Sequence, residues 1–127
     1  MATLEKKKAL ARKAARREGP VRASMRNLPM SARKVRVIAD AIRDTKLTHA
    51  LAFLSTQKKA CCVPLKKLLE AAAANADSRK LDVDELSISR IVVDKGPLRK
   101  RFMPRAQGRA TKIRKQTAHI EVFLGAN

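Results

Sequence analysis

The chain has 127 residues, which is about the size of one compact domain. It contains 30 Lys and Arg against 11 Asp and Glu, so its formal net charge is +19 and its pI is near 11.2. An ordinary cytosolic enzyme has no need of such a charge, and the self-repulsion destabilises a compact state unless a polyanion screens it. Because 45% of the residues are hydrophobic, a folded core is still possible, and nucleic acid is the leading partner.

Membrane and metal partners are not expected. No apolar run approaches the ~20 residues of a spanning helix, and the basic residues at 6–8 precede no signal-peptide apolar stretch. We therefore expect a cytoplasmic protein with no membrane partner. The two cysteines, Cys61 and Cys62, are adjacent, a spacing that suits neither a disulfide framework nor a zinc site. They are predicted to be small, buried or half-buried helix residues, and no metal or other cofactor is expected.

The N-terminal segment differs in composition from the rest of the chain. Residues 1–19 are predicted to be a basic extension, and residues 20–127 a globular domain. Before Gly19 and Pro20 stop any helix, seven Lys or Arg lie among Ala and Leu, which gives the extension helix propensity. Its apolar face, with Leu4 and Leu10, is thin, so we do not expect it to fold without a partner.

The next segment alternates apolar and polar residues. Residues 21–26 are predicted to form a short strand, which Pro29 ends. Ser31 is a good N-cap for a helix at residues 32–43, and Met30 stands at staple spacing from Val35. This helix separates an apolar face from a basic stripe that includes Arg36.

Two further helices and two strands follow. Apolar spacing predicts a short helix around residues 47–54 and a longer one over residues 61–76, which starts or bends near Pro64. The acidic segment at residues 77–85 is predicted to be a loop. Residues 86–94, rich in Ile and Val, and the alternating residues 118–124 are predicted to be strands.

Between these two strands lies a basic arm. Residues 95–120 include no acid and nine Lys or Arg, namely Lys95, Arg99, Lys100, Arg101, Arg105, Arg109, Lys112, Arg114 and Lys115. Few apolar residues accompany them, so no core can form there. We predict an extended hairpin at residues 95–111 that reaches on the order of 25 Å from the sheet. A two-stranded ribbon is marginally stable in water, so its order should come from phosphates of the partner.

Several runs in this sequence match a known family. They are KGP at residues 95–97, KRFMPRAQGRA at residues 100–110, TAHI at residues 117–120, SARKVR at residues 31–36 and AANA at residues 73–76. Over about residues 21–124 the chain resembles the family of the twenty-second protein of the bacterial large ribosomal subunit, whose hairpin lines the peptide exit tunnel. The resemblance implies an α+β fold with three helices packed on a small three-stranded antiparallel sheet and a long protruding β-hairpin.

The resemblance also implies a function. The protein would be a structural, non-enzymatic constituent of the large ribosomal subunit that binds ribosomal RNA (rRNA), supports subunit assembly and lines the tunnel with its hairpin. The implied partners are rRNA, neighbouring ribosomal proteins and the nascent polypeptide, with no homo-oligomer expected.

Two sets of residues are predicted to form the interface. The rRNA-binding residues are Arg22, Arg26, Arg33, Lys34, Arg36, Lys95, Arg99, Lys100, Arg101, Lys112, Arg114, Lys115 and His119. By matched position, the tunnel-lining tip is Met103, Pro104, Arg105, Ala106, Gln107, Gly108 and Arg109. Gln107 stands where family members often carry a basic residue, which implies one weaker contact at the tip.

Two other function classes compete with this one. An enzyme needs a nucleophile, an acid–base pair or a metal cluster, and the chain offers none; His49 and His119 are predicted to be surface or RNA-facing residues. An architectural DNA-binding protein is the stronger rival, because such proteins use basic β-arms with a wedge such as Met103 or Pro104. They need a dimer to place two arms on the duplex, and no dimer seam is evident.

Overall fold

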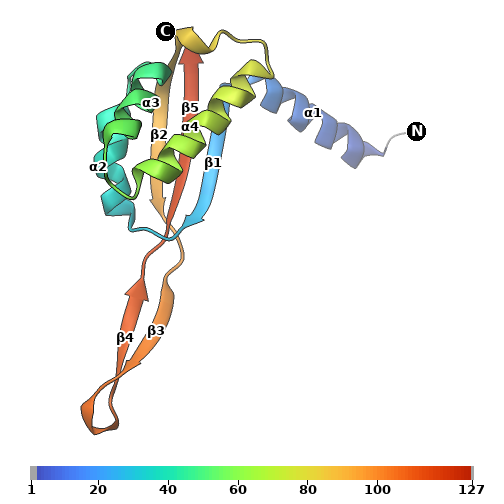
Figure 1. The fold of residues 1–127 in the computed structure, drawn as a ribbon. Helices are drawn as coiled ribbons and strands as arrows, with labels where there is room; N and C mark the ends of the chain where they lie inside the picture. Colours follow the sequence, from blue (N-terminus) through green and yellow to red (C-terminus); the bar gives the residue numbers. More distant parts are fainter. Residues whose placement is uncertain (1–2, 127) are drawn as a thin grey trace.

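Residues 3–126, which the structure describes, form four α-helices, two 3-10 turns and two antiparallel sheets. The structure is a computed structural model, and it describes side chains at residues 3–14 and 19–125. In chain order the elements are α1 (Leu4–Glu18), β1 (Val21–Leu28), α2 (Ala32–Ile42), α3 (Leu47–Thr56), α4 (Cys62–Asp77), η1 (Val83–Glu85), β2 (Leu86–Lys95), β3 (Arg99–Pro104), η2 (Ala106–Gly108), β4 (Ala110–Lys115) and β5 (Ala118–Ala126). Figure 1 shows a body from which α1 and the β3–β4 hairpin project separately. The predicted α+β class is confirmed.

The body is built on the three-stranded sheet. Its order is β1-β5-β2, and both pairs are antiparallel. Helices α2, α3 and α4 pack against this sheet (Figure 1). The central strand β5 alternates between the two faces, with Ile120 and Val122 fully buried and Phe123 half-buried. The single core therefore lies between the three helices and one face of the sheet.

Helix α2 follows the predicted apolar spacing. Val35, Ile38 and Ile42 are buried, and the helix ends at Ile42. Ser31 occupies the N-cap position, but its hydroxyl donates to Gln116 Oε1 at 2.8 Å and makes no bond to the helix backbone. The prediction that its side chain caps the helix is therefore wrong, because the strand returning from the hairpin supplies a competing acceptor.

Helix α4 begins at Cys62, so Pro64 lies in its first turn. A proline is tolerated there because the first N–H groups of a helix have no partner within it. Cys61 and Cys62 are both free and buried, as predicted. Burial raises the pKa of the Cys62 thiol above its ordinary value, which keeps the thiol protonated at neutral pH.

Helix α1 corrects the predicted number of helices from three to four. Its Ala, Leu, Lys and Arg residues all have high helix propensity, so the helix forms although residues 3–14 are exposed along their whole length. Where the helix ends, Arg79 Nη1 on the loop after α4 donates to the carbonyl oxygen of Gly19 at 2.6 Å. Helix α1 therefore joins the body at its end and projects away from it (Figure 1).

Both outer edges of the main sheet are partly occupied by other groups of the body. On β1, the carbonyl oxygen of Arg22 accepts a hydrogen bond from Asn75 Nδ2 at 3.1 Å. On β2, the carbonyl oxygen of Val93 accepts from Arg36 Nε at 3.0 Å and Nη2 at 2.7 Å, and residues 44–46 bond to the same strand. Side chains and a loop thus occupy edge groups that would otherwise be free to pair with another strand.

The hairpin joins the body at a narrow neck. The Gly96 N–H donates to the Thr117 carbonyl oxygen at 2.8 Å, and the buried Thr117 hydroxyl donates to the Pro97 carbonyl oxygen at 2.7 Å. A Cβ at position 96 would overlap Thr117 Oγ1. Glycine is therefore needed at position 96, because the Thr117 side chain approaches its Cα too closely to leave room for a Cβ.

Gly96→Ala is expected to lower the free energy of unfolding by about 1–3 kcal/mol, because the displaced Thr117 hydroxyl loses its buried partner. Gly125→Ala is the matched control, since a Cβ there would lie 3.4 Å from Ser89 Cβ, an ordinary contact. Chemical denaturation of both variants measures the difference. Equal stability of the two variants would show that the neck has no such constraint.

Candidate nucleic-acid interface

The hairpin places like charges opposite each other. Strands β3 and β4 are antiparallel, and Arg99 pairs with Lys115 while Lys100 pairs with Arg114. Like charges directly opposite in a sheet are destabilising. Among the side chains that the structure describes, at residues 3–14 and 19–125, none of these four cations forms an ion pair with an acid. The charge pattern of the hairpin therefore opposes its own pairing in the absence of a counterion.

The hairpin also lacks a core. Every residue from 97 to 112 is exposed, and Ile113 is half-buried. Phe102, the one aromatic residue of the hairpin, is 65% exposed, and Met103 is 39% exposed. The second strand of the hairpin, β4, ends at Lys115, four residues after residue 111, where the hairpin was predicted to end. Hydrogen bonds between the two strands are thus the main internal support of this ribbon.

Two consecutive left-handed residues form the hairpin tip. Gln107 has φ 61° and Gly108 has φ 68°, and the Arg105 N–H donates to the Arg109 carbonyl oxygen at 2.7 Å. A Cβ at position 108 would meet no atom within 4 Å, so backbone conformation and not space favours glycine. The turn sets Arg105 and Arg109 at its two ends with both side chains exposed.

A second basic surface lies on the open face of the main sheet. Arg22 of β1 and Arg90 of β2 both pair with Phe123 of β5, so the three side chains form one row across the sheet. The Arg90 guanidinium carbon lies 5.9 Å from the centre of the Phe123 ring, within the range of a cation–π contact. Arg26 is exposed further along β1. Arg22 and Arg26 are among the residues predicted from the sequence to bind rRNA, and Arg90 is not.

Two predicted RNA-binding residues also have structural contacts. Arg36 bonds the Val93 carbonyl oxygen through two nitrogens, as described above. His119 is half-buried, and its Nδ1 accepts a hydrogen bond from the Asn27 N–H at 3.0 Å. This bond supports Asn27 in a left-handed conformation with φ 57°, beside the irregular pairing near the end of β1. Both side chains therefore position elements of the body.

The family of this basic protein follows from comparison with known proteins. Residues 23–125 match the model of the family described as ribosomal protein L22p/L17e. The chain belongs to the L22p/L17e family. It is also 46% identical over 105 residues to the large ribosomal subunit protein uL22 of Myxococcus xanthus (strain DK1622), a match that covers 80% of this chain and 92% of that relative.

Membership in the L22p/L17e family settles the class of the protein. It is a structural, non-enzymatic component of the large subunit of the cytoplasmic ribosome. Among the described side chains, no three His, Cys, Asp or Glu residues are grouped closely enough to hold a metal ion. No helix in the described part of the chain is both long and apolar enough to cross a membrane.

The family match includes the hairpin but not helix α1. It begins at residue 23, whereas α1 ends at Glu18. Five described side chains of α1 carry positive charge, namely Lys6, Lys7, Lys8, Arg12 and Lys13, and all are exposed. Any contact made by α1 is therefore additional to those of the shared domain.

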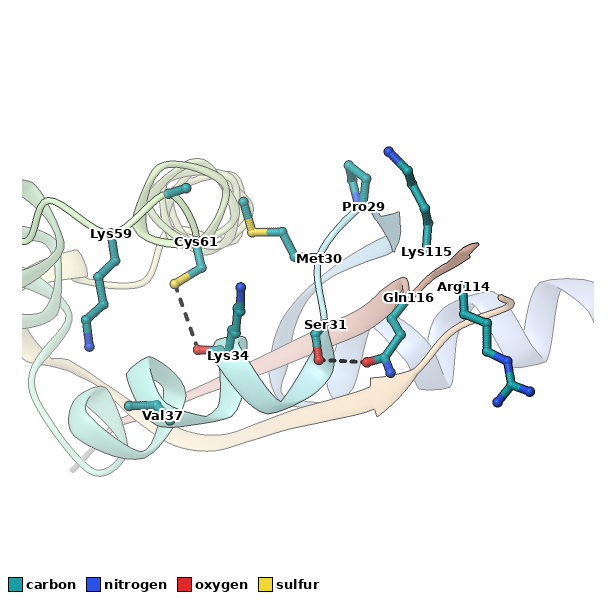
Figure 2. A pocket seen from close by; sticks show the side chains of 11 residues that line it. Pro29, Met30, Ser31, Lys34, Val37, Lys59, Cys61, Arg114, Lys115 and Gln116 are labelled. Atoms are coloured by element: carbon teal, nitrogen blue, oxygen red, sulfur yellow. Dashed lines mark hydrogen bonds between the residues drawn. The ribbon is translucent and has the colours of Figure 1, made fainter. Parts of the chain in front are cut away.

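The other predicted residues fall into two groups. Lys34 of α2 lies with Arg114 and Lys115 around an open groove at the hairpin base (Figure 2). Arg33 and Lys95 are exposed and do not line that groove.

Lys59 lines the same groove and is not among the residues predicted from the sequence. Nothing in the sequence distinguishes it from its neighbour Lys58, because only the fold brings it beside the hairpin. Arg90 did carry a signal, since it is the one cation inside a run of Ile, Val and Ser at residues 87–93.

Proposed function

We propose that this L22p/L17e protein binds rRNA of the large subunit through its hairpin and the basic surfaces of its body. In this proposal residues 20–127 are the RNA-binding domain and residues 1–19 a basic extension. The main support for this proposal is the structure of the hairpin. It projects with opposed cations, no acid and no core, so a folded polyanion supplies what the ribbon lacks (Figure 1).

Recognition would depend on RNA shape and phosphate positions. The chain has three Phe and no Trp or Tyr, and Phe123 already lies beneath Arg90. A stacking platform for successive bases is therefore missing. Arg99, Arg101, Arg105 and Arg109 can each fork onto phosphates or lie flat on a base, whereas Lys100 provides a point charge.

The proposal assigns two roles to the hairpin. Its strands contact rRNA segments on both sides and hold them together during assembly. Its tip, Met103 to Arg109, lines the peptide exit tunnel and faces the nascent polypeptide. The body, with Arg22, Arg26, Arg33 and Lys34 exposed, contacts rRNA and neighbouring ribosomal proteins at the subunit surface.

A photoreactive amino acid at position 103 tests the tunnel-lining role. Met103 is 39% exposed at the end of β3, so p-benzoylphenylalanine is accommodated there. In ribosomes carrying a stalled nascent chain, we expect crosslinks to that chain and to rRNA. The same substitution at Leu81, 45% exposed on the body, should give none to the nascent chain. If the amino acid at position 103 formed no crosslink to the nascent chain, tunnel lining by the tip would be ruled out.

A further inference from the structure

The groove at the hairpin base is formed by three separate parts of the chain. Pro29, Met30 and the start of α2 form one side, residues 59–61 before α4 form another, and residues 114–116 at the end of the hairpin form the third. It encloses about 880 Å³, within the ~300–1,000 Å³ typical of small-ligand sites. Figure 2 shows Lys59 and Lys115 at opposite ends of this groove.

The groove combines an apolar wall with a basic rim. Met30 is half-buried, Val37 is 57% exposed, and Cys61 is buried with its thiol 3.9 Å from the Lys34 carbonyl oxygen. The rim cations are Lys34, Lys59, Arg114 and Lys115, and no acidic residue lines the groove. This combination fits a ligand with a flat apolar part and at least two negative charges.

The groove is also fixed relative to the hairpin. The hydrogen bond from the Ser31 hydroxyl to Gln116 Oε1 crosses from the body to the end of the hairpin (Figure 2). Arg114 and Lys115 belong to both the groove and the basic strand β4. A polyanion that follows β4 toward the body therefore meets the groove directly.

We propose that this groove receives one unstacked nucleotide of large-subunit rRNA. Its base lies on Met30, Pro29 and Val37, and its flanking phosphates contact Lys34 and Lys59 on one side and Arg114 and Lys115 on the other. The proposal rests on rRNA binding by the hairpin and adds a defined subsite. Unstacked bases of loops and bulges are the usual targets of specific RNA recognition. Continuity with the basic hairpin favours RNA over an acidic protein segment.

Photocrosslinking in assembled large subunits identifies the occupant. p-Benzoylphenylalanine in place of the exposed Val37 is expected to crosslink to one rRNA nucleotide. Phe102 is 65% exposed on the hairpin, so the same amino acid at position 102 tests whether the hairpin contacts rRNA, which is the proposed function. A crosslink at 102 with none at 37, or a crosslink from 37 to a ribosomal protein, overturns the groove proposal alone. No rRNA crosslink at either position overturns rRNA binding by the hairpin.

A charge test uses two adjacent lysines. Lys58 and Lys59 are both exposed, but only Lys59 lines the groove. Lys59→Ala should weaken rRNA binding about tenfold at low salt and reduce the slope of log affinity against log salt by about 1. It should also expose the bound nucleotide to chemical probing. Lys58→Ala removes the same charge and should leave that nucleotide protected. Equal probing of the two variants would contradict the proposal.

Discussion

Replacing residues 97–116 with an Asn-Gly turn is expected to leave the body folded and to reduce affinity for large-subunit rRNA by at least about 100-fold at physiological salt. The body survives because β2 and β5 already meet at Gly96 and Thr117, whose backbone groups are bonded at 2.8 Å. The RNA contact is lost because the segment carries eight of the 30 Lys and Arg. Binding isotherms at several salt concentrations measure both affinity and slope, and the slope should become shallower by several units.

Deleting residues 1–19 is the comparison, since it removes seven Lys and Arg together with two Glu, a net loss of five positive charges against eight for residues 97–116. We expect a much smaller loss of rRNA affinity, because this segment lies outside the family match at residues 23–125. An equal loss of binding free energy per net charge removed in the two deletions would mean that net charge alone governs binding. Duplex DNA competing as well as rRNA with the full chain would favour the architectural DNA-binding alternative.

Ile120→Ala is expected to destabilise the free protein by about 2–5 kcal/mol, through lost apolar burial and the cavity left behind. Ile120 is fully buried in the central strand β5, between Met25 of β1 and Val93 of β2. Domains of this size are stable by only about 5–15 kcal/mol, and here self-repulsion lowers that margin. Thermal and chemical unfolding should therefore show a large shift.

Phe102→Ala provides the contrast on the hairpin. Phe102 is larger than Ile120 but 65% exposed, so its truncation should change the unfolding free energy by less than about 0.5 kcal/mol. A comparable loss of stability in the two variants would show that Phe102 packs against the body in solution.

Local periodicity was sufficient to predict most of the elements. The spacing of Val35, Ile38 and Ile42 predicted α2, and it held because that apolar face meets the sheet. Alternation from Ala118 to Leu124 predicted β5, with one face buried. The start of α4 near Pro64 followed from the missing N–H of proline.

Contacts between distant segments could not be predicted in the same way. The Ser31 hydroxyl meets Gln116 across 85 positions of sequence, and Arg36 meets Val93 across 57. A single sequence carries no local signal for such pairs, so neither contact could be predicted from it. The groove lined by Lys59 and Arg114 arises from the same long-range assembly.

The basic surfaces likewise include one part that the sequence alone predicts and one part that depends on the fold. The charge run of the hairpin was visible in the sequence because it depends on neighbouring residues alone. The row formed by Arg22, Phe123 and Arg90 depends on strand register, which only the fold supplies.

Amide hydrogen exchange of the purified protein, with and without large-subunit rRNA, tests most directly whether RNA holds the hairpin in shape. Without RNA, amides in β3 and β4 should exchange almost as fast as in an unfolded chain, while those of β5 in the body stay protected. Adding rRNA should slow exchange in the hairpin by orders of magnitude. Strong protection of β3 and β4 in the RNA-free protein would contradict this account.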